Sequence, residues 1–403
     1  MIGFKEAQRI ILEHINLLGA EQVELTGALN RIAAEDQTAA FSIPAADNAS
    51  MDGFAFGHGS SPDVCYTVCG YVPAGIVLGE AVPPGCAVRI MTGAPIPPGC
   101  DTVAPLEEVL QDGEQIHIQR ELSAGAYIRR RGEDVRQGDV VISSGTLIRP
   151  QEIAMLAAMG MHRIAVYRLA KVAVLATGDE LLPPGSGLLP GRQYDSNSSA
   201  LAAQLLEAGA EPVLLGIAGD DPAAVRDKII AGLEADMLLI SGGASVGDRD
   251  WVRQVITELG GQIHFWRVNI KPGKPLAFAT LHGKPVFALP GNPVSTMVTF
   301  ELFVRPSLLK FMGHRRVLRS TIHALLEHSA ENSETRHQFA GCAVSERDGV
   351  HYASLTGSQS SGRLSVLTKA NGLAHLFPGA MFKQGEPVQV ILLDRCFEMG
   401  VWP

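Results

Sequence analysis

Between residues 171 and 312, short runs of Val, Leu, Ile and Ala alternate with segments whose apolar positions recur every three to four residues. The runs predict buried strands, and the wider spacing predicts helices. The expected strands cover residues 171–177, 212–217, 236–241, 263–268 and 286–289, and the expected helices cover 196–208, a segment from Pro222 capped by Asp221, 250–259 and 294–312. This alternation indicates a doubly wound α/β domain.

Loops rich in glycine and acidic residues follow four of these strands, at residues 177–180, 219–221, 241–248 and 290–293. One such loop is usually only a tight turn. Because the carboxyl ends of parallel strands meet at one edge of a sheet, where ligands bind, four of them favour a site. Glycines let backbone N–H groups approach an anion, and carboxylates suit a metal ion or an activated water. The loops therefore indicate a site for a phosphorylated substrate.

Two familiar nucleotide-binding patterns are missing from this region. The sequence has no Gly-x-x-x-x-Gly-Lys-Ser/Thr motif, and no Gly-x-Gly-x-x-Gly follows a strand. A P-loop NTPase and a Rossmann dehydrogenase are therefore disfavoured.

Lys271 and Lys274 lie in a proline-bounded turn, Lys-Pro-Gly-Lys-Pro, directly after an apolar run. Two lysines in a rigid turn form a focused positive spot, and lysine binds oxyanions as a point charge. A solvated turn is the alternative, and the turn alone does not decide between them. Asn292 precedes the last helix of the domain, which fits an anion site at a helix N-terminus as well as ordinary capping.

The segments on either side of this region show different patterns of apolar residues and turns. Apolar residues at helical spacing predict a helix over residues 4–18, and Pro150 is expected to begin another. Residues 41–148 alternate short β-prone runs with Pro/Gly turns, which indicates a β-rich region. After Arg315 the chain is β-rich again, with strands expected at 338–344, 350–355 and 387–392, and we interpret this part as a small barrel.

Composition limits the function classes. A chain of 403 residues is expected to form two to four domains, and a net charge of -9 argues against general nucleic-acid binding. We expect no signal peptide and no membrane-spanning segment, and we interpret the six cysteines as reduced cytoplasmic thiols. A zinc site at Cys65 and Cys69 is possible, but an unliganded pair is favoured because no Cys/His partner pair lies nearby.

The motifs together resemble the molybdopterin molybdenumtransferase family, which includes the bacterial MoeA proteins and the E domain of gephyrin. The matching motifs include Asp-Asn-Ala-Ser-Met-Asp-Gly at 47–53, Met-Thr-Gly-Ala-Pro at 91–95, Gly-Glu-Asp at 132–134, Thr-Gly-Asp-Glu-Leu at 177–181, Asp-Ser-Asn at 195–197, Ser-Gly-Gly-Ala-Ser-Val-Gly at 241–247, Lys-Pro-Gly-Lys-Pro at 271–275 and Pro-Gly-Asn-Pro at 290–293. The resemblance covers nearly the whole chain.

The resemblance implies an elongated homodimer of four-domain subunits. The expected domains are a discontinuous helical and extended dimerisation region at 1–40 and 141–168, a β-rich domain at 41–140, an α/β molybdopterin-binding domain at 169–313 and a C-terminal β-barrel domain at 314–403. The implied activity is insertion of molybdate into adenylylated molybdopterin with release of AMP, with Mg²⁺ as the divalent cation. Transient contacts with the molybdopterin adenylyltransferase and with molybdoenzyme-maturation proteins are expected, and none with nucleic acid or membrane.

The resemblance also assigns roles to single residues. Asp52 and Thr92 would reach the site across the dimer interface, and Glu180, Asp220 and Asp250 would supply carboxylates to the metal and the phosphoanhydride. The expected substrate-binding residues are Ser241, Gly242, Gly243, Ser245, Arg267, Lys271, Lys274, Pro290, Gly291, Asn292, Arg336 and Ser361.

The chain departs from the family pattern at two positions. Arg267 stands where many relatives carry lysine, which keeps the charge but changes its geometry. Many relatives carry arginines on both sides of an aromatic residue in the C-terminal part; here Arg336 precedes Phe339, but Ala340 stands in the second place.

Two other functions remain open from the sequence. One is adenylylation of molybdopterin itself, which the β-rich flanks argue against. The other is a non-catalytic scaffold, which the intact set of acids and lysines argues against.

Overall fold

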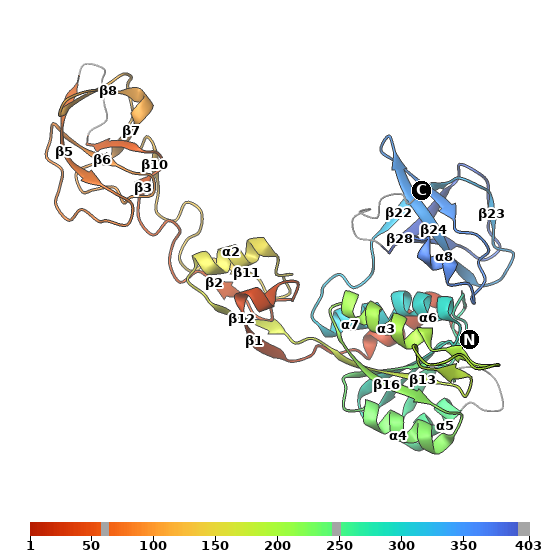
Figure 1. The fold of residues 1–403 in the computed structure, drawn as a ribbon. Coiled ribbons are helices and arrows are strands. Elements are labelled where there is room, and N and C mark those ends of the chain that lie inside the picture. The colour runs from red at the N-terminus through yellow and green to blue at the C-terminus, as the bar shows by residue number, and fades with distance from the viewer. Residues whose placement is uncertain (58–63, 244–250, 394–403) are drawn as a thin grey trace. The chain divides into compact units, whose positions relative to one another are not determined.

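The computed structural model describes residues 1–57, 64–243 and 251–393, which form two compact units (Figure 1). The first unit contains residues 1–23, 30–34 and 165–403, and the second contains residues 24–29 and 35–164.

A six-stranded sheet in the order β16-β13-β17-β21-β20-β18 is the centre of the first unit. Its strands are β13 (Lys171–Thr177), β16 (Glu211–Ala218), β17 (Met237–Ser241), β18 (Gln262–Phe265), β20 (Ala277–Leu281) and β21 (Lys284–Leu289). The first four strands in this order pair in parallel, whereas β20 is antiparallel to both of its neighbours. The sheet therefore brings four carboxyl strand ends to one edge.

Helices cover both faces of this sheet (Figure 1). They are α3 (Ser196–Glu207), α4 (Pro222–Gly232), α5 (Trp251–Glu258), α6 (Pro293–Thr299) and α7 (Arg305–Phe311). Val172 and Val174 of β13 pack in one core with α3 and α6, while Ala173 and Leu175 pack in another with α4 and α5. The alternation follows from the two-residue period of a strand. It explains why a strand covered on both faces reads as a continuous apolar run.

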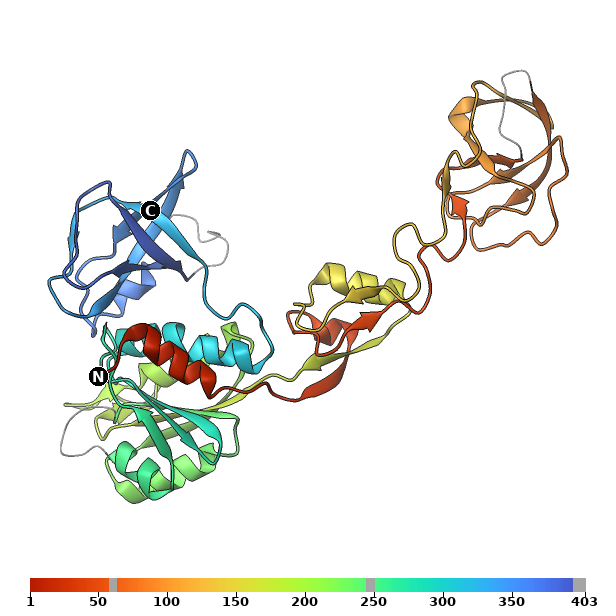
Figure 2. The same ribbon diagram turned by 180° about the vertical axis from the view of Figure 1, so that it is seen from behind.

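Helix α1 (Phe4–Glu13) packs on the same face as α7 (Figure 2). Its apolar positions Phe4, Ala7 and Ile11 are buried in the core of the α/β domain. The predicted helix over residues 4–18 is thus too long by five residues. Ile15, beyond the helix end, is buried with only 1% of its surface exposed. The apolar spacing continues past the helix because the following segment also packs on the core.

The predicted helix over 294–312 is present, but it contains a π-helical segment, η3 (Phe300–Val304), between α6 and α7. Pro306 follows this segment and has no N–H to donate to the carbonyl four residues earlier. That carbonyl, Leu302 O, accepts a hydrogen bond from Gln8 Nε2 of α1 at 3.0 Å instead. The contact ties the N-terminal helix to the irregular turn.

Strand β20 was not predicted. It forms a hairpin with β21 through His282 and Gly283, whose φ angles are 49° and 75°. Two successive positive φ angles are typical of a tight hairpin turn. The predicted strand over 263–268 is present only as β18, which ends at Phe265, and Ile270–Lys271 forms the separate strand β19.

The C-terminal part of the first unit is a closed barrel, as predicted. Its strands are β22 (Thr321–Leu326), β24 (His337–Arg347), β25 (Val350–Leu355), β26 (Gly372–Leu376) and β28 (Pro387–Leu392). The ring closes because β24 pairs with both β25 and β26, while β22 pairs with β25 and β28, and β28 with β26. Outside the ring, β19 pairs in parallel with β24, Ile270 opposite His337. The lysine turn therefore begins beside the barrel.

Small elements complete the first unit. They are β14 (Leu181–Leu182), which pairs with β15 (Gln193–Tyr194), β23 (Ala330–Glu331), which pairs with β27 (Met381–Phe382), and the short helix α8 (Ser365–Thr368). In addition, β1 (Ala20–Glu24) pairs with β12 (Arg163–Tyr167); the last residue of β1 and the first two residues of β12 belong to the second unit.

The second unit is β-rich, as predicted. Its main sheet has the order β7-β4-β6-β5-β9-β8. The strands are β4 (Gly53–Phe56), β5 (Cys65–Val72), β6 (Cys86–Ile90), β7 (Thr102–Pro105), β8 (Val109–Asp112) and β9 (Gln115–Ile118). The remaining elements are β2 (Gln37–Thr38), β3 (Asn48–Ala49), β10 (Ile128–Arg129), β11 (Val140–Ile142), the short 3₁₀ turns η1 (Leu25–Ala28) and η2 (Leu106–Glu108), and α2 (Pro150–Ala158), which begins at Pro150 as predicted.

The expectation that the cysteines are reduced thiols is wrong for one pair in the structure. Cys69 and Cys86 form a disulfide with a Cα–Cα separation of 5.9 Å. They lie on β5 and β6, which pair directly, so the two side chains come within the reach of a disulfide.

The predicted architecture, a central α/β domain with β-rich N-terminal and C-terminal parts, is confirmed. No helix within the described residues combines the length and the apolar character needed to cross a membrane.

Candidate active site

A cleft of about 490 Å³ opens at the carboxyl edge of the sheet, within the usual size range of ligand pockets. Loops after β13, β16, β17 and β21 all contribute to it. Its described lining residues are Thr177, Gly178, Glu180, Leu181, Gln193, Asn197, Asp220, Ser241, Gly242, Gly243, Pro275, Pro290, Gly291, Asn292 and Ser295. The prediction that the four loops share one edge is therefore confirmed.

The strands end in step at this edge. Thr177 lies opposite Ala218, Ala176 opposite Ser241, and Ser241 opposite Leu289. The loops therefore leave the sheet at neighbouring points, which is why segments more than a hundred residues apart meet in one cleft.

Gly242 and Gly243 let the loop after β17 pass close to β13. Their φ angles are 93° and 65°, a region that side-chain-bearing residues adopt only with strain. A Cβ on Gly242 would lie 2.6 Å from Thr177 O, and one on Gly243 would lie 2.5 Å from Val252 Cγ2. The sequence requirement at these two positions is therefore steric as well as conformational.

Asn197 connects three elements at the cleft. It lies in the first turn of α3, which Asp195 caps by accepting a 3.0 Å bond from Ser198 N. Asn197 Nδ2 donates to Ser241 Oγ and to Gly291 O, both at 2.8 Å. We did not predict a site role for Asn197. The sequence feature that could have indicated it is a polar residue two positions after the helix cap Asp195.

Two buried polar atoms of the lining have no hydrogen-bond partner within the described part of the chain. They are Thr177 Oγ1 and Asn197 Oδ1. Buried polar groups in native structures are nearly always paired, so unpaired ones need an explanation. A ligand in the cleft would supply the missing partner.

The acidic residues of the loops differ in what they do. Asp179 Oδ1 accepts a bond from Asp220 N at 3.0 Å, and Asp221 caps α4 by accepting from Ala224 N at 2.8 Å. Both are thus engaged in shaping the loop. The carboxylate of Asp220 lines the cleft and has no partner among the described residues. Glu180 also lines the cleft, and its carboxylate accepts a long hydrogen bond of 3.5 Å from Gln193 Nε2.

The described lining carries the carboxylates of Glu180 and Asp220 but no lysine or arginine. An anionic ligand would be repelled here unless a cation accompanied it. No group of three or more His, Cys, Asp or Glu residues in the described ranges is arranged to hold a metal ion. Two carboxylates nevertheless suit Mg²⁺, which is usually held by one or two carboxylates together with substrate phosphates.

None of the predicted cationic residues is among the described residues that line the cleft. Pro275, in the same turn as Lys271 and Lys274, is part of the lining. Lys274 is exposed and Arg267 is half-buried, and neither side chain has a hydrogen-bond partner among the described residues.

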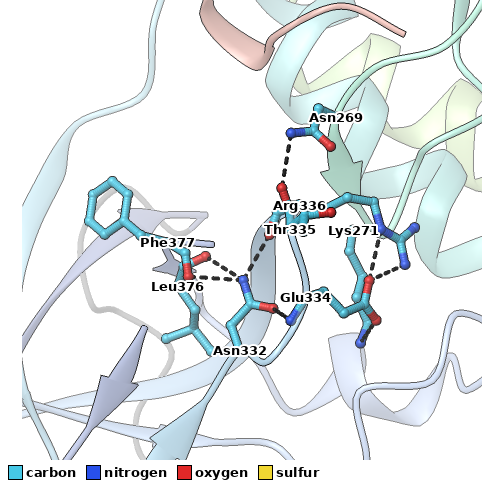
Figure 3. Close-up of polar contacts among 8 residues, drawn as sticks. All are labelled: Asn269, Lys271, Asn332, Glu334, Thr335, Arg336, Leu376 and Phe377. Atoms are coloured by element: carbon cyan, nitrogen blue, oxygen red, sulfur yellow. Dashed lines mark hydrogen bonds and ion pairs between the residues drawn. The ribbon is translucent and has the colours of Figure 1, made fainter. Parts of the chain in front are cut away.

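Lys271 and Arg336 are brought together by a residue that the sequence did not identify, Glu334 (Figure 3). Lys271 Nζ donates to Glu334 Oε1 at 2.7 Å, and Arg336 Nε donates to Glu334 Oε2 at 2.8 Å. The bond from Lys271 lowers the pKa of Glu334 most. Burial, the next largest effect, raises it, and the bond from Arg336 lowers it again, so that the pKa stays below its ordinary value. Glu334 is separated from Lys271 by 63 positions, so no local pattern points to the contact.

Ser361 lies beside the loop after β21. Its hydroxyl accepts from Asn292 Nδ2 at 3.1 Å, and its carbonyl accepts from Val294 N at 3.2 Å. The barrel segment that carries Ser361 is therefore hydrogen-bonded to the start of α6.

Asp52 and Thr92, in the second unit, contact each other. Asp52 Oδ1 accepts from Thr92 Oγ1 and from Thr92 N, both at 2.7 Å. The two bonds, first that of the hydroxyl, lower the pKa of Asp52, with a smaller contribution from the charge of Arg89. The pair is thus an ionised, oriented carboxylate. Ser245 and Asp250, the remaining predicted site residues, lie outside the described residues.

Comparisons with known proteins agree with this arrangement. Residues 2–160 match the model of the MoeA N-terminal region, residues 173–310 that of the probable molybdopterin binding domain, and residues 324–393 that of the MoeA C-terminal region. The molybdopterin molybdenumtransferase of Nostoc sp. is 35% identical over 98% of this chain and 94% of its own. The enzyme of that name from Haemophilus influenzae is 38% identical over 78% of this chain and 79% of its own.

A solved structure of the molybdopterin biosynthesis MoeA protein from Pyrococcus horikoshii is also similar. It superposes with a TM-score of 0.86 and 31% identity, and the match covers 98% of this chain and all of that one. The predicted resemblance is confirmed over the full length, and this chain belongs to the molybdopterin molybdenumtransferase (MoeA) family.

Proposed function

We propose that this chain is a transferase of molybdenum cofactor biosynthesis that inserts molybdate into adenylylated molybdopterin and releases AMP. The observation that carries the proposal is the cleft in which four loops of one parallel sheet converge, with two carboxylates inside and a lysine turn at its border. The family to which the chain belongs supports the identity of the substrate.

The backbone of the cleft suits a phosphorylated ligand. Gly242, Gly243 and Gly291 present main chain without side-chain obstruction, so N–H groups can approach phosphate oxygens. Asn197 holds two of these loops at fixed positions through Ser241 and Gly291. Preorganised donors of this kind stabilise developing charge without reorganising during the reaction.

Cleavage of the phosphoanhydride requires neutralisation of its oxygens. Glu180 and Asp220 would hold Mg²⁺, with Asp250 as a further proposed ligand, and the bound ion supplies that neutralisation. The carboxylate of Asp220 has no partner among the described residues, whereas those of Asp179 and Asp221 are engaged, and this difference supports the division of roles.

Molybdate is a tetrahedral dianion, and it has to be held beside another anion. We propose that Lys271, Lys274, Arg267 and Arg336 provide the positive charge, with the Ser361 hydroxyl as an additional contact. The proximity of Lys271 to Arg336, bridged by Glu334, supports a shared anion subsite.

The carboxylate of Asp52 and the hydroxyl of Thr92 are proposed to act at the cleft of a partner subunit in a homodimer. If so, an Asp52→Ala chain mixed with an Asp220→Ala chain should regain activity, because one of the two sites in the heterodimer carries both wild-type residues. The recovered activity should approach half of the wild-type value per heterodimer. If both parents stay inactive after verified subunit exchange, each site is built within one chain.

The proposed setting is the cytoplasm, with transient contacts to the molybdopterin adenylyltransferase and to molybdoenzyme-maturation proteins. Activity with purified components tests the reaction separately from these partners. AMP release from adenylylated molybdopterin in the presence of molybdate and Mg²⁺ would support the proposal. Formation of adenylylated molybdopterin from molybdopterin and ATP by this chain alone would instead indicate the preceding step.

A further inference from the structure

Glu334 satisfies both cations of the proposed anion subsite at once (Figure 3). Its Oε1 accepts from Lys271 Nζ at 2.7 Å, and its Oε2 accepts from Arg336 Nε at 2.8 Å and also from Arg336 Nη2. One carboxylate oxygen therefore faces each cation. Two oxygens of a tetrahedral oxyanion would present the same pair of acceptors.

The turn that carries Glu334 is held in place by Asn332, which is 2% exposed. Asn332 Oδ1 accepts from Glu334 N at 3.2 Å, and Asn332 Nδ2 donates to Arg336 O, Leu376 O and Phe377 O at 2.8, 3.1 and 3.0 Å. The carbonyl of Thr335 also accepts from Asn269 Nδ2 at 3.1 Å. The backbone is thus fixed by the barrel, and the carboxylate is delivered to the cations by a rigid turn.

The side chains, in contrast, remain accessible. Lys271 is 33% exposed, Glu334 34% and Arg336 28%. Ion pairs with this much exposure are weak, because water screens their charges. An incoming anion can reach them and replace the carboxylate.

We propose that Glu334 is a built-in competitor of the oxyanion: its carboxylate occupies Lys271 and Arg336 until molybdate displaces it. This inference rests on the proposed function, which assigns these two cations to the oxyanion. It makes Glu334 a residue that determines which anions are accepted, because every anion has to replace a negative charge that is already present.

The selectivity follows from counting charges. Glu334 carries one negative charge against the two positive charges of Lys271 and Arg336. A singly charged anion that replaces the carboxylate brings the same negative charge, so its attraction to the two cations is no stronger than that of Glu334. A dianion brings one further negative charge to the same two cations, so only the dianion gains from the exchange.

A purely supporting role for Glu334 predicts the opposite result. If the carboxylate served to hold Lys271 and Arg336 in the geometry that binds the oxyanion, its loss would weaken binding. Removing a competitor strengthens binding. The sign of the change therefore separates the two interpretations.

The experiment is titration calorimetry of sodium molybdate into the full chain and four variants. Glu334→Gln removes the charge with little change in shape, and Glu334→Asp keeps the charge but shortens its reach. Glu331→Gln is the matched control: it makes the same change of net charge three positions earlier, at an exposed residue with no side-chain partner among the described residues. Lys271→Ala tests the subsite itself.

We expect Glu334→Gln to bind molybdate roughly 2- to 5-fold more tightly, which corresponds to the strength of a partly exposed ion pair. Glu334→Asp should show a smaller gain, Glu331→Gln no change, and Lys271→Ala weaker binding. Perchlorate, a tetrahedral monoanion, should bind measurably to Glu334→Gln and not to the wild type.

Unchanged or weaker molybdate binding by both Glu334 variants, with weaker binding by Lys271→Ala, would overturn the competitor while leaving the proposed subsite intact. Equal gains in Glu334→Gln and Glu331→Gln would reduce the effect to net charge and would also overturn it. Molybdate binding that is insensitive to Lys271→Ala, or undetectable in both the wild type and Glu334→Gln, would overturn the subsite together with its competitor.

Discussion

Asn197 provides a sharp test of how the cleft is held together. Its side-chain amide is the only described group that hydrogen-bonds both the end of β17, at Ser241, and the loop after β21, at Gly291. Replacing Asn197 with alanine removes both bonds without affecting the α3 cap, which is made by Asp195. The loops that carry the predicted substrate contacts should then lose their common anchor.

The magnitude follows from the two lost bonds. At roughly 1 kcal/mol each, they give about 2 kcal/mol of lost stability. For a domain of this size the loss corresponds to roughly 4–8 °C in melting temperature. Asn197→Asp should cost more, because a carboxylate oxygen would then face Gly291 O, which can only accept. The effect on turnover should be larger, roughly 100-fold, since small displacements of positioning groups reduce rates strongly.

Thermal unfolding and AMP release measure the two effects separately. Ser199→Ala is the control, because Ser199 is an exposed residue of the same helix with no side-chain bond in the described structure. It should retain wild-type stability and turnover. If Asn197→Ala melts within about 1 °C of the wild type and also turns over normally, Asn197 does not anchor the loops.

Further predictions concern three aspartates in different surroundings. Asp220→Ala should abolish molybdate-dependent AMP release without lowering the melting temperature, whereas Asp221→Ala should lose about 1 kcal/mol through its lost helix cap and stay active; the reverse pattern would exchange their roles. Burial raises the pKa of Asp236. The hydrogen bonds from Arg168 and Lys171 N together outweigh this effect, so the pKa lies below its ordinary value of 3.8. The resulting stability, about 1 kcal/mol because Arg168 is partly exposed, is present above that pH and lost as the pH falls through the lowered pKa. Asp236→Asn should therefore melt earlier than the wild type at pH 7, and the difference should disappear in acid; a difference independent of pH would contradict the ion pair.

The sequence predicts the central domain well because its inner strands are buried on both faces. Residues 172–176 are apolar throughout, and the glycine-containing segment that follows this strand is one of the loops that line the cleft. Strand β20 escaped prediction since its hairpin turn is His282-Gly283, which is not one of the Asn-Gly, Asp-Gly or Gly-Gly pairs that signal such a turn. The π-helical segment was also missed, because its stabilising partner, Gln8, lies almost three hundred residues earlier in the chain.

The candidate site was predictable where chemistry is local and unpredictable where it depends on distant contacts. Glu180 and Asp220 follow strand ends, so topology alone brings them together. Glu334 reaches Lys271 only because β19 pairs with β24 outside the barrel ring. Asp220 and Asp221 are adjacent acids in the sequence. Only the structure shows which of them caps the helix, because Ala224 N donates its hydrogen bond to Asp221.

The most direct test of the proposed activity is AMP release by the purified chain from adenylylated molybdopterin, with and without molybdate, in the presence of Mg²⁺. We expect AMP to appear together with molybdenum bound to the pterin product; both should require molybdate, and Asp220→Ala should prevent both. Release of AMP at the same rate without molybdate, or full activity of the Asp220→Ala variant, would contradict the proposed activity.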